Sequence, residues 1–232
     1  TFYGGFIFAT GVILIFAKIK GIPMLRGIDI IAPCLMLGLM FGRVGCLLNG
    51  CCWGEICDRE AVPWAITFPY GSPPFEEHYQ DGDLDEGSIP AELFRTIPDE
   101  NGMLVQTLID PKDVAAVERL STLAAESRSL PVHPTQLYSS LNGFLLFGLS
   151  LAYLTLLPAP GRVAALVLMS YAPARFTIEL LRVNTPLAGD LTYSLWVSIF
   201  VFSAGLALFV AAGRIAARTE ATSPAASSTT SS

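Results

Sequence analysis

Residues 137–157 read LYSSLNGFLLFGLSLAYLTLL, a stretch without a single charged side chain. An α-helix rises about 1.5 Å per residue, so a helix of this length crosses the roughly 30 Å hydrocarbon core of a bilayer. A helix on the surface of a soluble protein would carry a charged face instead. The stretch therefore predicts a transmembrane helix.

Four further apolar segments accompany this one. Two of them are interrupted by charges, the first by Arg43 and the second by Arg175 and Glu179. Ionisable residues inside a membrane segment cost about 2.5–3.5 kcal/mol each on insertion scales, so they should face a polar interior. The sequence predicts an all-α polytopic membrane protein with about five transmembrane helices. The four segments are residues 2–17, 30–48, 163–181 and 191–213.

The overall composition supports the membrane interpretation. Hydrophobic residues make up 52% of the chain and charged residues only 15%, against about 25% charged residues in soluble domains. The formal net charge of −6 argues against a nucleic-acid partner, because no basic face is available to meet phosphate chains. Sixteen of the 20 acidic residues lie within residues 55–126, which predicts a polar insert between the second and third helices.

The basic residues predict the orientation in the membrane. Cytoplasmic loops carry an excess of Lys and Arg, and six such residues fall on one side of a five-span chain. The insert is therefore expected to be extracytoplasmic and the C-terminus cytoplasmic, with Arg182 as the exception. The six residues are Lys18, Lys20, Arg26, Arg162, Arg214 and Arg218.

Four segments follow from these patterns. We expect two transmembrane helices with a Gly/Arg motif in residues 1–54, an acidic extracytoplasmic insert in 55–133, and three transmembrane helices in 134–213. Residues 214–232 are expected to form a disordered cytoplasmic tail. Because the chain begins without Met and inside an apolar run, upstream helices are expected as well.

Within the insert the pattern predicts a small β core and one short helix. The helix would begin at Pro111 and extend to Ser127, with Val114, Val117, Leu120 and Leu123 as its apolar positions. The apolar residues expected to form the β core are Leu93, Phe94, Ile97, Met103, Leu104, Val105 and Leu108.

Cysteines cluster at the end of the second apolar segment. Cys46, Cys51, Cys52 and Cys57 lie close together in sequence, and Cys34 lies within the segment. The spacings are not those of a paired C-x2-C zinc ribbon. We expect small apolar packing residues with one disulfide, so no metal ligand is assigned; a metal site is the alternative.

The charges in segment 163–181 permit two interpretations. On one helix Arg175 and Glu179 are i, i+4, Glu179 and Arg182 are i, i+3, and Tyr171 precedes Arg175 by one turn. All four would then share a face. They form either an internal clamp that holds helices together or a site for an anionic headgroup, since an arginine fork matches phosphate oxygens bidentately.

Five motifs occur in a fixed order along the chain. They are Tyr3-Gly4-Gly5; Gly42-Arg43-x-Gly45-x-x-x-Asn49-Gly50-x-x-Trp53-Gly54; Pro63-Trp64-Ala65 with Phe68-Pro69; His133-Pro134-Thr135-Gln136-Leu137-Tyr138; and Tyr171-x-x-x-Arg175-Phe176-x-x-Glu179-x-x-Arg182. Together they resemble the bacterial prolipoprotein diacylglyceryl transferase family, and the likeness extends from the first residues to about Trp196. Members are similar seven-helix inner-membrane proteins, which implies that this chain begins near their third helix.

The resemblance implies an enzyme of lipoprotein biogenesis in the bacterial inner membrane. It would transfer the diacylglyceryl group of phosphatidylglycerol to the lipobox cysteine of a prolipoprotein signal peptide, form a thioether and release glycerol phosphate, without a cofactor. The residues implied to be catalytic are Arg43, Arg175, Tyr171, His133 and Tyr3. Those implied to bind substrate are Gly4, Gly5, Asn49, Gly54, Gln136, Tyr138, Glu179 and Arg182.

Three positions depart from the family pattern. The family usually has His where this chain has Tyr3, Asn where it has Cys46, and Glu where it has Cys51. Tyrosine, with an ordinary pKa of about 10, is a poor base near neutral pH, so the base is either His133 or absent. Two alternatives to the transferase therefore stay open: a diverged, inactive relative that binds anionic lipid or a partner, and a membrane thiol or metal protein.

Overall fold

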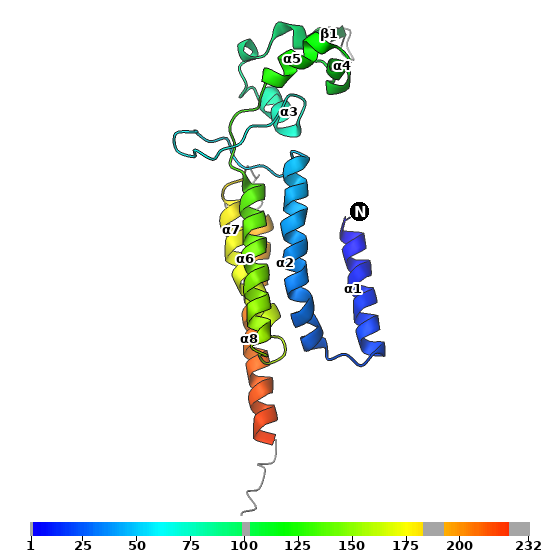
Figure 1. Cartoon of the computed structure of the whole chain (residues 1–232), viewed down its shortest axis with the longest axis vertical. Coiled ribbons are helices and arrows are strands. Elements are labelled where there is room, and N and C mark those ends of the chain that lie inside the picture. The colour runs from blue at the N-terminus through cyan, green and yellow to red at the C-terminus, as the bar shows by residue number, and fades with distance from the viewer. Residues whose placement is uncertain (1, 99–102, 183–192, 223–232) are drawn as a thin grey trace, which may run out of the picture. The chain divides into compact units, whose positions relative to one another are not determined.

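A computed structural model of the chain describes residues 2–98, 103–182 and 193–222 (Figure 1). The side chains of residues 2–7, 9, 10, 14, 86, 193, 194 and 219–222 lie outside that description. The chain divides into two compact units. The helical unit comprises the described parts of Thr1–Phe41, Ser139–Glu179 and Asn184–Ser232, and the polar unit comprises Gly42–Tyr138 and Leu180–Val183.

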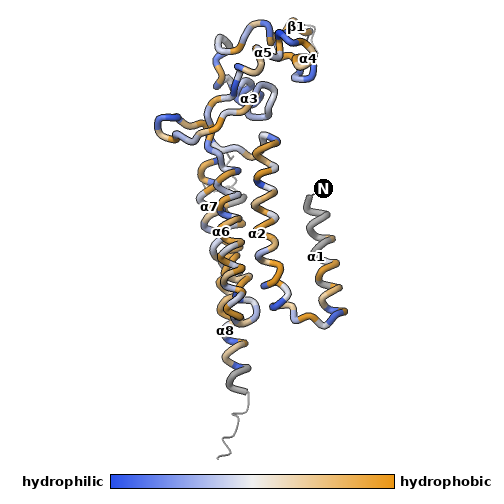
Figure 2. The backbone as a smooth tube through the Cα atoms, in the orientation of Figure 1, coloured by the Kyte–Doolittle hydropathy of each residue, from blue (hydrophilic) through white to orange (hydrophobic). Residues whose placement is uncertain are grey.

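Each of the five apolar segments contains one long helix in its described part. Within the described ranges, three helices are long and apolar enough to cross a membrane, namely Met24–Leu48, Thr135–Thr155 and the Leu195–Arg218 part of α8. Figure 2 shows hydrophobic residues along these helices. The protein is thus mostly helical, with three candidate membrane-spanning helices. The five long helices are α1 (Phe2–Ile19), α2 (Met24–Leu48), α6 (Thr135–Thr155), α7 (Arg162–Glu179) and α8 (Tyr193–Thr222).

Small residues allow close packing in the helical unit. A Cβ on Gly205 of α8 would lie 2.9 Å from Leu168 Cβ of α7, and one on Gly143 of α6 would lie 3.0 Å from the Met36 carbonyl oxygen of α2. Helices in membranes associate through such contacts, because lipid offers no hydrophobic drive for their association. A core of small and branched side chains from α2, α7 and α8 completes the packing: Ile28, Ala32, Met36, Ala164, Val167 and Leu208.

A buried carboxylate ties α2 to the start of α7. Asp29 is fully buried, and its two oxygens accept hydrogen bonds from the backbone N–H groups of Gly161 (2.7 Å) and Ala164 (2.9 Å). These are unpaired donors at the N-terminus of α7, where the helix dipole also favours a negative charge. Asp29 therefore acts as an N-cap supplied by another helix.

We expect Asp29→Ala to lower the free energy of unfolding by about 1–2 kcal/mol, the upper range for loss of a helix N-cap. Asp29→Asn keeps one carbonyl acceptor, so its loss should be intermediate. Thermal unfolding in detergent, followed by far-UV circular dichroism, measures both effects. An unchanged midpoint in Asp29→Ala would show that the cap contributes nothing to stability.

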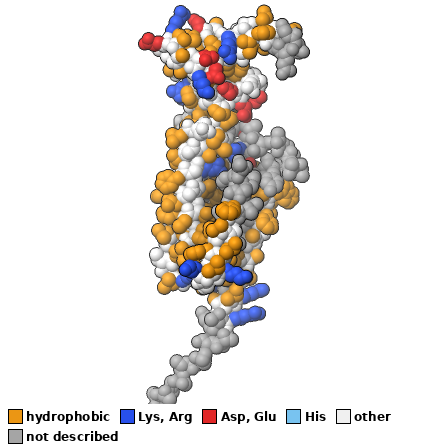
Figure 3. Space-filling model, turned by 90° about the vertical axis from the view of Figure 1, so that its right-hand side faces the viewer, with side chains coloured by type: hydrophobic (Ala, Val, Ile, Leu, Met, Phe, Trp, Pro, Cys, Tyr) orange, Lys and Arg blue, Asp and Glu red, His pale blue; other side chains and the backbone are white. Residues whose placement is uncertain are grey.

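Basic side chains gather at the same end of the helical unit (Figure 3). Arg26 donates to the Pro158 carbonyl oxygen (3.0 Å), and the Arg162 guanidinium lies 5.3 Å from the centre of the Phe209 ring. Arg26 lies in the first turn of α2, and Arg162 is the first residue of α7. Two of the six basic residues expected on one side of the membrane thus lie at one end of this unit.

The polar unit has a compact core built around α3. Its two strands pair antiparallel, with Phe94 opposite Leu108 and Pro98 opposite Leu104. The elements are α3 (Pro73–Gln80), η1 (Glu86–Ser88), η2 (Ala91–Leu93), β1 (Phe94–Pro98), β2 (Leu104–Leu108), α4 (Pro111–Ala115) and α5 (Glu118–Glu126). The buried hydrophobic core is Tyr70, Phe75, Leu84, Ile89, Leu93 and Val114.

The predicted β core of the insert is wrong in its outer half. Leu93, Phe94 and Leu108 belong to the core, whereas four other predicted members are exposed: Ile97 (41%), Met103 (68%), Leu104 (75%) and Val105 (44%). A two-stranded hairpin offers only limited apolar contact by itself, and here its inner end packs on α3, which the sequence interpretation did not predict.

The predicted helix over 111–127 is two helices. Asp110 caps α4, since its side chain accepts from the Lys112 N–H at 2.9 Å, and α4 ends at Ala115. Val117 is extended and 46% exposed before α5 begins. Because the helix breaks after Ala115, Val114 enters the core while Val117 does not. In one continuous helix the two valines, three residues apart, would lie on the same face.

Two predicted helix ends are also wrong. The helix α7 ends at Glu179 instead of residue 181, so Arg182 follows it in a bend and does not share its face. At the other end of the chain, α8 continues to Thr222 through residues 214–222, which were expected to be disordered. This part contains alanine and arginine, which are strong helix formers; residues 223–232 lie outside the described residues.

Candidate functional site

The Gly/Arg motif folds as the end of α2 and a tight turn. Gly50 has φ +65°, the left-handed conformation that glycine adopts without steric cost. The Gly50 N–H donates to the Leu47 carbonyl oxygen (3.2 Å) and the Cys51 N–H to the Cys46 carbonyl oxygen (3.0 Å). This pair of bonds is a Schellman motif, which turns the chain sharply and places Cys51, Cys52 and Gly54 beyond the helix end.

Gly54 is the point where three distant segments meet. Its N–H donates to the His133 carbonyl oxygen (3.0 Å), the His133 N–H returns a bond to Glu55 (3.0 Å), and the Glu55 N–H donates to the Leu181 carbonyl oxygen (2.9 Å). A Cβ on Gly54 would lie 2.6 Å from that Leu181 oxygen, 2.7 Å from His133 Cβ and 2.8 Å from Thr135 Cγ2. Only glycine fits here without displacing its neighbours. We call residues 50–55, 131–136 and 181 the motif junction.

Two buried side chains hold the turn from the other segment. Thr135 Oγ1 donates to the Cys52 carbonyl oxygen (2.8 Å) and Gln136 Nε2 to the Cys51 carbonyl oxygen (2.9 Å). Thr135 is 2% and Gln136 0% exposed. The sequence interpretation assigned Gln136 to substrate and Thr135, or a neighbour, to the start of the helix, but it did not place Thr135 in the site. Two adjacent polar residues at the start of an otherwise apolar helix are the sequence feature that could have indicated both hydrogen bonds.

The motif junction contains two buried polar atoms without a hydrogen-bond partner among the described residues. They are His133 Nδ1 and Gln136 Oε1. Leaving such an atom unsatisfied costs about 1–3 kcal/mol, and unsatisfied atoms in a native protein call for an explanation such as a bound ligand or water. Both atoms are therefore candidate contacts for a polar substrate group.

Trp64 and Tyr138 extend the polar side of this region. Trp64 Nε1 donates to Tyr138 Oη at 2.6 Å, and the Tyr138 ring lies 6.4 Å from the His133 ring, centroid to centroid. Trp64 is itself 61% exposed. An exposed aromatic side chain anchored by one hydrogen bond suits the polar boundary of a membrane.

The helical unit contributes an ion pair. Arg175 and Glu179 pair on α7 at i, i+4 spacing, with Nη1 bonded to Oε2. The Glu179 side chain is 4% exposed and that of Arg175 is 20% exposed. Tyr171 lies one turn earlier and is half-buried. The predicted shared face of these three residues follows from the continuous helix, whereas Arg182 belongs to the polar unit.

The remaining predicted residues have fewer described contacts. Arg43 is half-buried and Asn49 is exposed, both near the end of α2. Tyr3, Gly4 and Gly5 lie within α1, and their side-chain surroundings lie outside the described residues. The structure thus brings together Gly54, His133 and Gln136 in one unit and Arg175 with Glu179 in the other.

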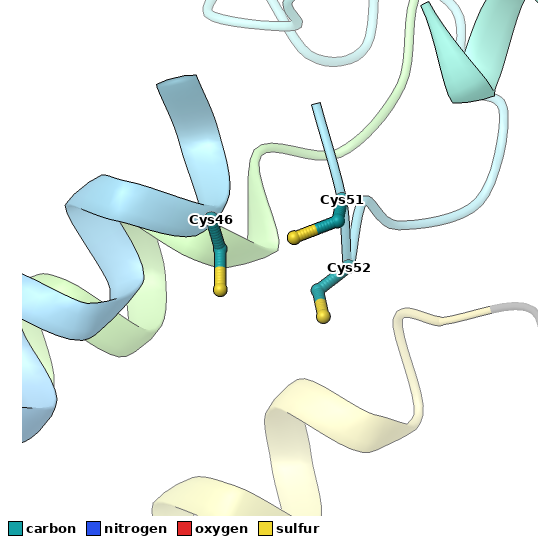
Figure 4. A group of neighbouring side chains, drawn as sticks. All are labelled: Cys46, Cys51 and Cys52. Atoms are coloured by element: carbon teal, nitrogen blue, oxygen red, sulfur yellow. The ribbon is translucent and has the colours of Figure 1, made fainter. Parts of the chain in front are cut away.

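Three thiols lie close together, two from the motif junction and one from the end of α2. The Sγ atoms of Cys46, Cys51 and Cys52 all lie within 4.8 Å of one another (Figure 4). Burial, and then the hydrogen bond with Cys46 and the neighbouring thiols, raise the pKa of Cys51 to about 11, against a small opposing effect of Asn49. Burial and the neighbouring Asp58 also raise the pKa of Cys57. All five cysteines are free thiols.

These features define a class: a helical membrane protein with a hydrogen-bonded junction of polar motifs beyond the end of α2 and a largely buried ion pair on α7. The sequence profile of the prolipoprotein diacylglyceryl transferases matches residues 1–211. The chain belongs to this family.

Curated relatives agree with this assignment. Proteins of Burkholderia mallei (strain SAVP1), Burkholderia pseudomallei (strain 668) and Burkholderia thailandensis are each named phosphatidylglycerol–prolipoprotein diacylglyceryl transferase. Each is 31% identical to this chain over 220 residues, which is 92% of this chain and 64% of the relative. The chain therefore spans somewhat less than two thirds of the length of these relatives.

Proposed function

We propose that this protein transfers the diacylglyceryl group of phosphatidylglycerol to the lipobox cysteine of prolipoproteins. The observation that carries the proposal is the motif junction, where the backbone of Gly54 and Glu55 is hydrogen-bonded to His133 and Leu181, which lie in two other motifs of the family resemblance. The names of the relatives supply the substrates. The reaction itself follows from the chemistry of these two substrates.

The reaction is a substitution at carbon. The lipobox thiolate attacks the carbon of the diacylglyceryl group that bears the phosphate, a C–S bond forms, and the bond between that carbon and the phosphate oxygen breaks. Glycerol phosphate leaves with the bonding electron pair, and the thiol proton goes to a base or to solvent. The leaving phosphate gains negative charge in the transition state, so fixed cations around it accelerate the step.

Arginines supply that charge in our proposal. Arg43 and Arg175 each present a planar guanidinium fork, which matches phosphate oxygens in a way that lysine cannot. Glu179 orients Arg175 through their ion pair, and Tyr171 lines the same helix face. Arg182 and Asn49 provide further polar contacts to the headgroup.

The unsatisfied atoms of the motif junction suit the glycerol hydroxyls of phosphatidylglycerol. Gln136 Oε1 and His133 Nδ1 lack partners in the described chain, and Tyr138 lies next to His133. A glycerol hydroxyl can donate a hydrogen bond to Gln136 Oε1 or His133 Nδ1, and its oxygen can accept one from a neighbouring donor. On the family resemblance alone, Tyr3, Gly4 and Gly5 of α1 are further proposed substrate contacts.

We further propose five transmembrane helices in a bacterial inner membrane, with the residue 55–133 insert extracytoplasmic and the C-terminus cytoplasmic. The gathering of Arg26 and Arg162 at one end of the helical unit supports a single cytoplasmic end under the positive-inside rule. The acidic insert then lies on the side from which an exported prolipoprotein is accessible.

Cysteine labelling tests this orientation. In a variant without native cysteines, Ser88→Cys should react with a membrane-impermeant maleimide added to intact spheroplasts, and Ser223→Cys should react only after the membrane is permeabilised. Comparing the two positions in one background controls for reagent leakage. The reverse labelling pattern would place the site on the cytoplasmic side and contradict the orientation.

The base is tested by one substitution and one pH series. An ordinary cysteine thiol has a pKa of about 8.5, so it is only a few per cent ionised at pH 7. If Arg43 and Arg175 ionise the substrate thiol without a protein base, His133→Gln should keep most activity, and turnover should rise as the pH approaches about 8.5. Complete loss of turnover in a folded His133→Gln that still binds phosphatidylglycerol would make His133 the base.

The activity is tested directly by incubating the full-length gene product with phosphatidylglycerol and a lipobox peptide. Mass spectrometry should detect the diacylglyceryl mass increment on the cysteine. The Burkholderia thailandensis relative serves as the positive control, and a peptide with serine in place of the lipobox cysteine as the negative control. Binding of phosphatidylglycerol without transfer would instead support the diverged relative, whose distinguishing feature is Tyr3 in place of histidine.

A further inference from the structure

Two thiols of the motif junction and one from the end of α2 form a set of soft ligands that the proposed reaction does not use. The Sγ atoms of Cys46, Cys51 and Cys52 lie within 4.8 Å of one another, and all three residues are half-buried. Figure 4 shows their sulfurs facing a common space, Cys46 from the end of α2 and the other two from the turn. Cys34 and Cys57 do not belong to this cluster.

The backbone around the cluster is held from several sides. The Schellman motif at Gly50 ends α2 so that Cys51 returns to a hydrogen bond with Cys46. Thr135 and Gln136 fix the carbonyl oxygens of Cys52 and Cys51. Cys52 itself has φ +60°, a conformation that costs a residue with a Cβ about 1 kcal/mol or more and persists only where the surroundings impose it.

The spacing suits one metal ion. Zinc–sulfur bonds are about 2.3 Å long, so two sulfurs on a tetrahedral ion lie roughly 3.8 Å apart. The cluster is therefore already close to a ligating arrangement and needs side-chain adjustments of about 1 Å or less. A disulfide uses two sulfurs and leaves the third unexplained, whereas a metal uses all three.

We propose that Cys46, Cys51 and Cys52 bind one thiophilic metal ion, Zn(II) or Cu(I). Thiolate sulfur is a soft ligand that selects these ions over Mg(II) or Ca(II). Each thiol releases its proton to solvent as its sulfur–metal bond forms, and no electron is transferred. Three thiolates leave a net charge of −1 with Zn(II) and −2 with Cu(I), so burial favours Zn(II), with water as a fourth ligand.

The proposed ion would have a structural effect on the motif junction. It would join the last turn of α2 to the turn whose carbonyl oxygens Thr135 and Gln136 hold. This differs from the sequence-based expectation of one disulfide and no metal. It does not depend on the transferase proposal, since the cysteines have no part in that reaction.

The experiment uses the reduced, chelator-treated chain, purified anaerobically in detergent. Zn(II) and Cu(I) are added in separate arms, and equilibrium dialysis with elemental analysis measures the bound ion. We expect one ion per chain in at least one arm. X-ray absorption at the metal edge should report three sulfur ligands on the unmodified protein, which requires no variant to fold.

Single substitutions then assign the ligands. Cys46→Ser, Cys51→Ser and Cys52→Ser should each weaken metal binding at least about 100-fold. Substituting a residue that only hydrogen-bonds to a metal ligand already weakens affinity by up to about 100-fold. Cys34→Ser and Cys57→Ser are matched controls and should bind as the unmodified chain does. Far-UV circular dichroism and gel filtration check the fold of each variant.

Several results would overturn the proposal. These are no binding of either ion by the reduced chain, fewer than three sulfur ligands in the absorption spectrum, or loss of binding in Cys57→Ser. Binding that persists in any of the three cluster variants would do the same. A disulfide within the cluster, found by mass spectrometry in a chain that binds no metal after reduction, would establish a redox pair instead.

Discussion

Arg175→Lys is expected to lower turnover at least about tenfold, equivalent to about 1.4 kcal/mol of transition-state stabilisation. Lysine keeps the positive charge and can still pair with Glu179, whose side chain is 4% exposed. It loses the planar fork that binds two phosphate oxygens together. Arg43→Lys should have an effect of similar size for the same reason. The single-turnover rate with phosphatidylglycerol and a lipobox peptide measures both.

Arg162→Lys provides a matched control on the same helix. Arg162 lies at the opposite end of α7, over the Phe209 ring, and has no proposed contact with substrate. Its substitution should leave turnover unchanged. If folded Arg175→Lys retained the unmodified rate, Arg175 would have only the role of joining helices, and the anionic-headgroup interpretation of the α7 pair would fail.

Gly54→Ala is expected to lower the free energy of unfolding by about 1–3 kcal/mol, the usual range for overpacking a filled site, and to reduce turnover strongly. The added Cβ would lie within 2.8 Å of atoms from Leu181, His133 and Thr135. Two of these contacts involve the backbone carbonyl oxygen of Leu181 and the Cβ of His133, which cannot move without moving their segments. Thermal unfolding and the transfer assay measure the two effects.

Gly45→Ala is the control for the glycine substitution. A Cβ at Gly45 meets nothing within 4 Å, and the residue lies inside α2. Alanine has a higher helix propensity than glycine by up to about 1 kcal/mol, so stability should be unchanged or slightly higher. Equal effects of the two substitutions would show that the close contacts around Gly54 do not decide its role.

The sequence predicted the helices because their signal is local. Long runs without charge cannot be buried in a small soluble domain, and each of the five segments contains a long helix in its described part. The insert was harder to predict, because α3 and the split between α4 and α5 depend on which side chains reach a shared core. Val114 is 3% exposed and Val117 is 46% exposed. Both residues are valine, so their hydrophobicity could not reveal this difference in burial.

The site residues were found in sequence as separate motifs. Their order identified the family, and the i, i+4 spacing of Arg175 and Glu179 predicted the ion pair that α7 contains. The end of α7 was predicted two residues too late, and Arg182 was wrongly expected to share the helix face of Arg175 and Glu179. The apolar residues Leu180 and Leu181 follow Glu179, so hydropathy does not mark the end of the helix. Beyond that end, the Leu181 carbonyl oxygen accepts a hydrogen bond from the Glu55 N–H, a residue far away in sequence.

By itself, the sequence determined that this is a helical membrane protein with polar motifs in a fixed order, because segment length, hydropathy and residue spacing are properties of the local chain. Only the tertiary structure decided the partners of those motifs. Asp29 caps a helix that begins more than 130 residues later, and Gly54 has space for no side chain because His133 and Leu181 surround it. The physical reason is that buried N–H and carbonyl groups must find partners wherever the fold brings them, and sequence spacing does not specify those partners.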